Sequence, residues 1–215
     1  MDLPFEQFPA LSAIEIFRHV FTHRIPGIDV SHDKAEVLKR LDAAHREIRN
    51  VIGIGDWPVF TTEQIHGNKI AEIDSLIQLR LPQSRLSPSA RGEDEGEGFE
   101  RTCRGSTLTL SLGKGEATQA TRDHAKVSAS NDMPEKYGNE FPACDGIITN
   151  QRGIAIGVYV ADCCAVYIVD PKTPAIGLVH SGRKGTELGV VTNAITQMIS
   201  RFESDPANMV VQLSP

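Results

Sequence analysis

Three short apolar runs, rich in Val and Ile, follow one another in the C-terminal half of the chain, over 154–160, 166–169 and 175–179. Apolar runs of this length are typical of buried strands. Asp-Pro and Thr-Pro pairs separate the last two runs, and such pairs mark a turn. The pattern therefore predicts a β-hairpin with its turn over 170–174.

After this hairpin the spacing of apolar residues changes to that of a helix. Apolar positions recur every three or four residues from Val191 to Phe202, which predicts an amphipathic helix. His180 therefore lies where a strand passes into a helix. Backbone N–H groups and the helix dipole favour an anion at such a junction, and Arg183 and Lys184 add positive charge.

The N-terminal part of the chain predicts a strand over 14–21 and then a helix with Asp33 as its N-cap. The apolar face of this helix carries Leu38, Leu41, His45 and Ile48. We interpret His45 as a packed core histidine, because one histidine on an apolar face is rarely a ligand. Gly53 and Gly55 are expected to end the helix.

Two further strands, predicted over 57–62 and 70–73, flank a polar segment that contains His66 and Gly67. A histidine beside a glycine between two strands is, taken alone, typical of a turn residue.

The composition changes between 82 and 138, where Gly, Ser, Thr, Arg, Glu and Asp dominate and apolar periodicity is lost. Such a segment buries too little apolar surface to offset its ordering entropy. We expect a disordered insertion here, with one edge strand over 107–112. Cys103 and His124 lie within it, and we assign them no chemical role.

Composition and charge narrow the choice of function. A chain of 215 residues suits one domain, and a formal net charge of −6 argues against nonspecific nucleic-acid binding. The N-terminus lacks the basic and apolar regions of a secretory signal, and no segment is apolar enough to span a membrane. The expectation is a cytoplasmic protein with no membrane partner. Four cysteines in such a chain favour free thiols or a metal thiolate over disulfides.

Four sequence blocks carry a family resemblance: EQIHGN at 63–68, CDGIITN at 144–150, ADCCAVYIVDP at 161–171 and GLVHSGRKG at 177–185. Together, and in this order, they resemble the signature blocks of the YfiH-like, laccase-domain family. That family is also called the multicopper polyphenol oxidoreductases and, more recently, the zinc-dependent purine nucleoside phosphorylases. FTHR at 21–24 resembles its opening block.

The resemblance implies a single α/β (α+β) domain over 1–215, with mixed β-sheets layered between helices in a YfiH-like four-layer sandwich. It also implies one zinc ion held by His66, Cys163 and His180. Two imidazoles and one thiolate leave one open position on a tetrahedral zinc, as in catalytic sites. Asp162 is expected to accept a hydrogen bond from a ligating histidine or a backbone group.

A second set of residues is expected to bind phosphate: Arg24, Ser181, Gly182 and Lys184. Arg24 is assigned by its position in the family's first block. The other three belong to the turn that follows His180. The alternative for Lys184 is a solvated residue of the first helical turn.

Several departures from the family pattern change this picture. Where the family usually has His-Ala-Gly-Trp-Arg-Gly, this chain has His-Ser-Gly-Arg-Lys-Gly over 180–185. Lysine keeps the charge of arginine and loses its bidentate recognition of phosphate. Ala165 replaces a proline, and the Gly-Pro block and further strands of the family are absent, so we expect a shortened member.

The reaction implied by the resemblance is phosphorolysis of adenosine, inosine, guanosine or methylthioadenosine to base and ribose 1-phosphate, with adenosine deamination as a side activity. The partners are then a purine nucleoside and phosphate. Copper chemistry would need more well-placed His and Cys residues than this chain offers. Two alternatives stay open: a cysteine hydrolase with Cys163 as nucleophile and His180 as base, and a non-catalytic zinc-binding module.

Overall fold

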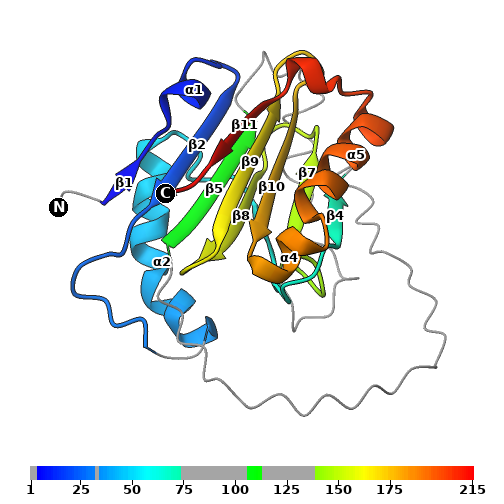
Figure 1. Cartoon of the computed structure of the whole chain (residues 1–215). Coiled ribbons are helices and arrows are strands. Elements are labelled where there is room, and N and C mark those ends of the chain that lie inside the picture. Colours follow the sequence, from blue (N-terminus) through cyan, green and yellow to red (C-terminus); the bar gives the residue numbers. More distant parts are fainter. Residues whose placement is uncertain (1–3, 32–33, 74–105, 113–138) are drawn as a thin grey trace, which may run out of the picture.

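The computed structural model describes residues 4–31, 34–73, 106–112 and 139–215, which build two β-sheets and their covering helices (Figure 1). From edge to edge, the six-stranded sheet consists of β1 (Phe5–Glu6), β2 (Phe17–Thr22), β5 (Ser106–Leu112), β8 (Ala155–Val160), β3 (Val59–Thr62) and β6 (Glu140–Phe141). The five-stranded sheet consists of β11 (Val210–Leu213), β9 (Cys164–Asp170), β10 (Ala175–Ser181), β7 (Gly146–Thr149) and β4 (Ile70–Ile73).

The helices are α1 (Pro9–Ser12), α2 (Lys34–Val51), α4 (Arg183–Glu187), α5 (Val190–Phe202) and the 3₁₀ helix η1 (Pro206–Asn208). In the described ranges, no helix is both long enough and apolar enough to pass through a lipid bilayer.

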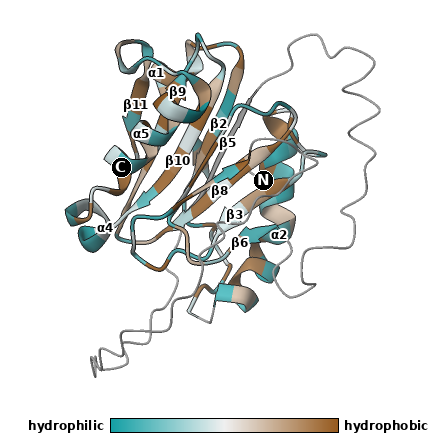
Figure 2. Ribbon diagram, turned by 90° about the vertical axis from the view of Figure 1, so that its right-hand side faces the viewer, coloured by the Kyte–Doolittle hydropathy of each residue, from teal (hydrophilic) through white to brown (hydrophobic). Residues whose placement is uncertain are grey.

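The two sheets face each other, and the main core lies between them. Phe21 and Ile156 of the six-stranded sheet share one buried cluster with Tyr167 and Leu178 of the five-stranded sheet. Helix α5 covers the outer face of the five-stranded sheet, and α2 covers the outer face of the other sheet (Figure 2). The order helix, sheet, sheet, helix confirms the predicted four-layer α/β architecture.

The predicted hairpin is confirmed: β9 and β10 pair antiparallel, with Ala175 opposite Asp170 and Ser181 opposite Cys164. Alternate residues of these strands enter different layers. Tyr167 of β9 faces the inter-sheet core, whereas Ile168 packs under α5. Because both faces are buried, the strands read as continuous apolar runs instead of alternating ones.

The N-terminal elements differ in detail from the expectation. The strand predicted over 14–21 is β2, and it begins at Phe17, because the backbone N–H of Phe17 donates to the carbonyl of Ile14 and closes a turn there. The buried face of α2 consists of Val37, Leu41, His45 and Ile48, with Leu38 only half-buried. The predicted N-cap Asp33 lies outside the described residues.

The strand predicted over 107–112 exists, but its predicted edge position is wrong. β5 pairs antiparallel with β2 on one side and with β8 on the other. It therefore fills an inner position of the six-stranded sheet, and this part of the 82–138 segment belongs to the fold. The rest of that segment, with Cys103 and His124, lies outside the described residues.

Candidate metal centre

The three predicted ligands come together at one end of the five-stranded sheet. His66 precedes β4, Cys163 precedes β9, and His180 lies near the end of β10. In the strand order β9-β10-β7-β4, β10 runs antiparallel to β9 and β7, and β7 runs parallel to β4. The end of β10 and the starts of its three companions therefore share one end of the sheet, which explains why ligands so far apart in sequence meet.

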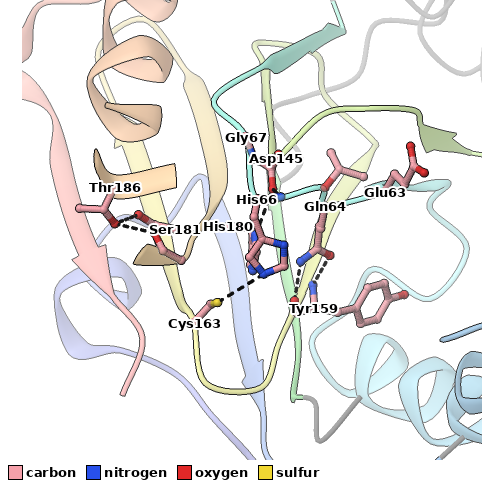
Figure 3. A network of polar contacts seen from close by, with 12 residues as sticks. Glu63, Gln64, His66, Gly67, Asp145, Tyr159, Cys163, His180, Ser181 and Thr186 are labelled. Atoms are coloured by element: carbon pink, nitrogen blue, oxygen red, sulfur yellow. Dashed lines mark hydrogen bonds and ion pairs between the residues drawn. The ribbon is translucent and has the colours of Figure 1, made fainter. Parts of the chain in front are cut away.

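One possible ligand atom from each of His66, Cys163 and His180 lies within 4.8 Å of the others. The Cys163 Sγ is 3.9 Å from His66 Nε2, and the two imidazole rings stand perpendicular with centroids 4.8 Å apart (Figure 3). His180 is buried, whereas His66 and Cys163 are half-buried. The cluster therefore combines two nitrogen donors and one sulfur donor at a place that solvent reaches.

Asp145, directly before β7, holds two parts of this cluster in place. Its Oδ1 accepts a hydrogen bond from the His66 backbone N–H at 2.8 Å and lies 3.1 Å from His180 Nδ1. Its Oδ2 accepts from the Gly67 N–H at 2.7 Å. If Nδ1 of His180 carries its proton toward this carboxylate, Nε2 is left as the nitrogen free to ligate, the usual arrangement of metal-binding histidines.

The Asp145 side chain is fully buried. Burial alone would raise the pKa of this carboxyl, but the hydrogen bonds from His180, Gly67 and His66 outweigh it, so its pKa is lowered. The sequence predicts that Asp162 accepts a hydrogen bond from a ligating histidine or a backbone group. In the structure Asp145 lies at hydrogen-bond distance from His180 Nδ1 and accepts from two backbone amides. Asp145 is part of the CDGIITN block, but no sequence spacing joins it to His180.

The loop that presents His66 has an unusual backbone. Gln64 and His66 have positive φ angles of 64° and 63°, a conformation that costs a residue with a side chain roughly 1 kcal/mol or more. Hydrogen bonds hold the loop in place. The backbone N–H of Gln64 donates to the Cys144 carbonyl, and those of His66 and Gly67 donate to the Asp145 carboxylate. Backbone strain held by surrounding bonds is common at functional sites.

Gly182 lies against the cluster. A Cβ built on this residue would be 2.8 Å from Cys163 Sγ and 3.2 Å from His66 Cδ2. Its backbone, with φ −85° and ψ 179°, is open to any residue. The requirement for glycine is therefore one of space, and the two side chains that need the space are predicted ligands.

The other predicted site residues are placed as follows. Asp162 is exposed, with its Oδ1 3.8 Å from Cys163 Sγ. Arg24 is exposed after β2, and Lys184 is exposed on α4. Part of the predicted turn over 181–185 is the five-residue helix α4, and the longer helix begins only at Val190.

The hydroxyl of Ser181 already has a partner. Thr186 Oγ1 donates to the Gly182 carbonyl at 2.8 Å, so the Ser181 hydroxyl is left to donate to Thr186 Oγ1, also at 2.8 Å. Ser181 thus fixes the turn that carries Gly182 and has no second proton to offer an anion.

Cys144, His19 and His45 show the properties of buried structural groups. Burial raises the pKa of Cys144 to about 11, which keeps it a thiol. Burial also lowers the pKa of His19 to about 4, and it lowers that of His45 to about 4 together with the nearby Arg49. His45 stacks on Tyr159, which confirms its prediction as a packed core histidine.

Curated relatives match this chain over part of its length. It is 42% identical over 82 residues to the purine nucleoside phosphorylase LACC1 of Mus musculus, which is 38% of this chain and 17% of the relative. It is 34% identical over 92 residues to the purine nucleoside phosphorylase ORF3 of Streptomyces griseus, which is 43% of this chain and 37% of the relative. The chain thus spans well under half of these relatives.

Solved structures share the fold over nearly the whole chain. YlmD from Geobacillus stearothermophilus superimposes with a TM-score of 0.56 at 17% identity, over 99% of this chain and 65% of that one. Bacillus licheniformis YfiH gives 0.52 at 17% identity, over 93% and 58%. The profile of the family described as multi-copper polyphenol oxidoreductase laccase matches residues 19–215. The chain therefore belongs to this laccase-domain family, which carries the YlmD/YfiH-like fold.

Proposed function

We propose that the chain binds one zinc ion through His66, Cys163 and His180. Three features of the described residues support this. They are the mixed nitrogen and sulfur donor set, the Asp145 carboxylate at hydrogen-bond distance from His180 Nδ1, and the space that Gly182 leaves beside two of the ligands. Soft thiolate and imidazole donors suit zinc. A bound zinc ion with three protein ligands would supply a Lewis acid with one coordination position for substrate or water.

We further propose that the reaction is phosphorolysis of purine nucleosides, with adenosine, inosine, guanosine and methylthioadenosine as the substrate range. In this reaction the bond between ribose C1′ and the purine nitrogen breaks, and a bond between C1′ and a phosphate oxygen forms. The observation that carries the proposal is the convergence of the three ligands in a chain whose relatives bear the name purine nucleoside phosphorylase. Adenosine deamination is proposed as a side activity.

Phosphate is proposed to bind beside the metal, at the turn after β10. The side chain of Lys184 and the backbone of Gly182 are the suggested contacts, with Arg24 as a further cation. Because the hydroxyl of Ser181 is bonded to Thr186, we assign Ser181 the role of shaping this part of the site. Helix α4 is short, so side-chain charge is expected to contribute more than its dipole.

The test is product formation by the purified, zinc-loaded chain. Inosine and phosphate together should release hypoxanthine and ribose 1-phosphate, and inosine without phosphate should release neither. Cys163→Ser should abolish the reaction, whereas Cys164→Ser is the matched control that retains it. Hypoxanthine release that does not depend on phosphate would contradict phosphorolysis, and zinc binding without any turnover would favour the non-catalytic module.

The cysteine hydrolase is the second candidate, because Asp145, His180 and Cys163 together are the residue types of a Cys-His-Asp triad. A thiolate bound to a metal is not free to attack a substrate. Hydrolase activity that rises when zinc is removed by a chelator would favour this alternative, and activity lost with the metal would exclude it.

A further inference from the structure

The side chain of Gln64 forms two hydrogen bonds with the backbone of one residue, Tyr159. Its Nε2 donates to the Tyr159 carbonyl at 2.5 Å, and its Oε1 accepts from the Tyr159 N–H at 2.8 Å (Figure 3). Gln64 is two residues before His66, and Tyr159 is four residues before Cys163. We propose that Gln64 is a positioning residue that sets the separation between the ligands His66 and Cys163.

The sheet explains why a side chain takes this place. β3 pairs with β8 only through Val59 and Phe60, and its next two residues pair with β6 instead. Tyr159 lies further along β8, and its other neighbour is Thr107 of β5. On the other side of Tyr159, beyond the two residue pairs that β8 forms with β3, no strand residue in the described ranges pairs with it. There the carboxamide of Gln64 provides one donor and one acceptor to the Tyr159 backbone, as the peptide group of a neighbouring strand would.

Among the hydrogen bonds that hold the His66 loop, two side chains link it toward the other two predicted ligands. Asp145 joins it to His180, since the same carboxylate binds the His66 N–H and the His180 ring. Gln64 joins it to the strand that leads to Cys163. Gln64 and His66 both have positive φ angles, and the loop has no regular secondary structure. Its backbone bond from Gln64 N to the Cys144 carbonyl does not reach the strand that leads to Cys163, so the Gln64 side chain makes that link.

The positioning role of Gln64 follows because Asp145 links the His66 loop to His180, whereas Gln64 links it toward Cys163. Loss of the Gln64 bonds should free His66 to move relative to Cys163 while its link to His180 through Asp145 remains. The consequence should be weaker metal binding and a weakened thiolate contact, instead of a general loss of structure. Partners that orient metal ligands typically contribute on the order of tenfold to a hundredfold in metal affinity.

This inference rests on the metal site of the proposed function, and it is tested with cobalt(II) as a spectroscopic probe in place of zinc. Gln64→Met keeps the length of the side chain and removes both hydrogen bonds, and Gln64→Ala removes the side chain. Gln7→Ala is the control, because Gln7 also donates from its side chain to a backbone carbonyl, that of His19, away from the ligands.

Both Gln64 variants should bind cobalt(II) on the order of tenfold to a hundredfold more weakly, with a weaker thiolate-to-cobalt charge-transfer band at saturation. Gln7→Ala should match the wild type in both measurements. Wild-type affinity and band intensity in folded Gln64→Met would overturn the positioning role, and reduced apo stability alone would not support it. A wild type that binds no metal would overturn both this inference and the proposed site, whereas normal metal binding without phosphorolysis would overturn only the proposed reaction.

Discussion

The buried carboxylate of Asp145 lies 3.1 Å from Nδ1 of His180 and also accepts hydrogen bonds from the backbone amides of His66 and Gly67. One side chain thus orients a ligand on β10 and the loop that carries a second ligand. We regard this relationship as the structural basis of the candidate metal site, because Asp145 leads into β7 and binds both a residue of β10 and the loop before β4, so it connects three of the four strands that meet there.

Replacing Asp145 with Asn should weaken the site and the fold together. An amide has one acceptor oxygen in place of two, so the second amide N–H would face an NH₂ group. We expect the free energy of unfolding to fall by about 1–3 kcal/mol, and zinc affinity to fall on the order of tenfold to a hundredfold. Urea denaturation of the apo protein and a chelator competition measure the two effects.

The matched control is Asp162→Asn, which removes the same charge from an exposed neighbour of Cys163. Asp162→Asn should change the free energy of unfolding and the zinc affinity little. If Asp162→Asn proved as costly as Asp145→Asn, the assignment of the orienting carboxylate would be wrong.

Gly182→Ala should affect metal binding more than stability. The new Cβ would approach Cys163 Sγ to 2.8 Å, so the ligands must shift, and overpacking of this kind costs about 1–3 kcal/mol. Zinc affinity should fall on the order of tenfold or more. Gly27→Ala is the opposite control: φ is +81° and no atom lies within 4 Å of a built Cβ, so stability should fall by about 1 kcal/mol with zinc affinity unchanged. Equal zinc affinity in both variants would contradict the packing argument.

His19 predicts part of the pH dependence of stability. It is 1% exposed, its Nε2 accepts from the Phe8 N–H at 2.7 Å, and burial lowers its pKa to about 4. Because the folded-state pKa is below the unfolded value of about 6.5, the stabilisation is complete above that pH and is lost as the pH falls toward 4. Between pH 7.5 and pH 5.5 the loss from His19 should be about 1 kcal/mol.

The comparison with His19→Gln isolates this contribution, because His45, whose pKa is also lowered, is present in both proteins. The glutamine carboxamide offers an acceptor for the Phe8 N–H and does not titrate in this range. The difference in unfolding free energy between wild type and variant should therefore shrink on going from pH 7.5 to pH 5.5. A constant difference would show that His19 does not titrate on unfolding.

Lys184→Ala should raise the phosphate concentration needed for half-maximal activity, on the order of tenfold to a hundredfold for one charge-assisted contact, with the KM for nucleoside changed less. Lys172→Ala is the control, since Lys172 follows β9 at the opposite end of the hairpin from Ser181. Steady-state kinetics at varied phosphate decide the matter. An unchanged phosphate dependence would identify Lys184 as a solvated helix residue.

Much of the fold could be predicted from local pattern. The apolar runs of β8, β9 and β10 are strong signals because these strands are buried on both faces. The position of β5 was harder to predict. It lies between β2 and β8 because it pairs with these distant segments, and the alternation of polar and apolar residues in β5 does not indicate which segments it pairs with. The split of the last helical region into α4 and α5 likewise depends on the left-handed conformation of Gly189, which its spacing alone does not disclose.

In the candidate site, too, some residues could be predicted from local sequence and others depend on contacts between distant segments. His66, Cys163 and His180 could be named from their sequence blocks, and they do converge. The residues that position them could not: Asp145 and Gln64 occur in the same blocks, but their roles depend on hydrogen bonds to His180 and Tyr159 across the sheet. The sequence analysis expects an acceptor role for Asp162, which is adjacent to a predicted ligand in sequence, and offers no signal for Asp145.

The most direct test of the account is the zinc content of the purified chain and of two cysteine variants. Cys163 and Cys164 are neighbours in sequence, but only Cys163 belongs to the ligand cluster, while Cys164 Sγ contacts the carbonyl of Ala165 at the start of β9. We predict one zinc per chain for the wild type and for Cys164→Ser, and a small fraction of that for Cys163→Ser with the fold retained by circular dichroism. Equal zinc content in the two variants, or none in the wild type, would contradict the assignment of His66, Cys163 and His180 as a metal site.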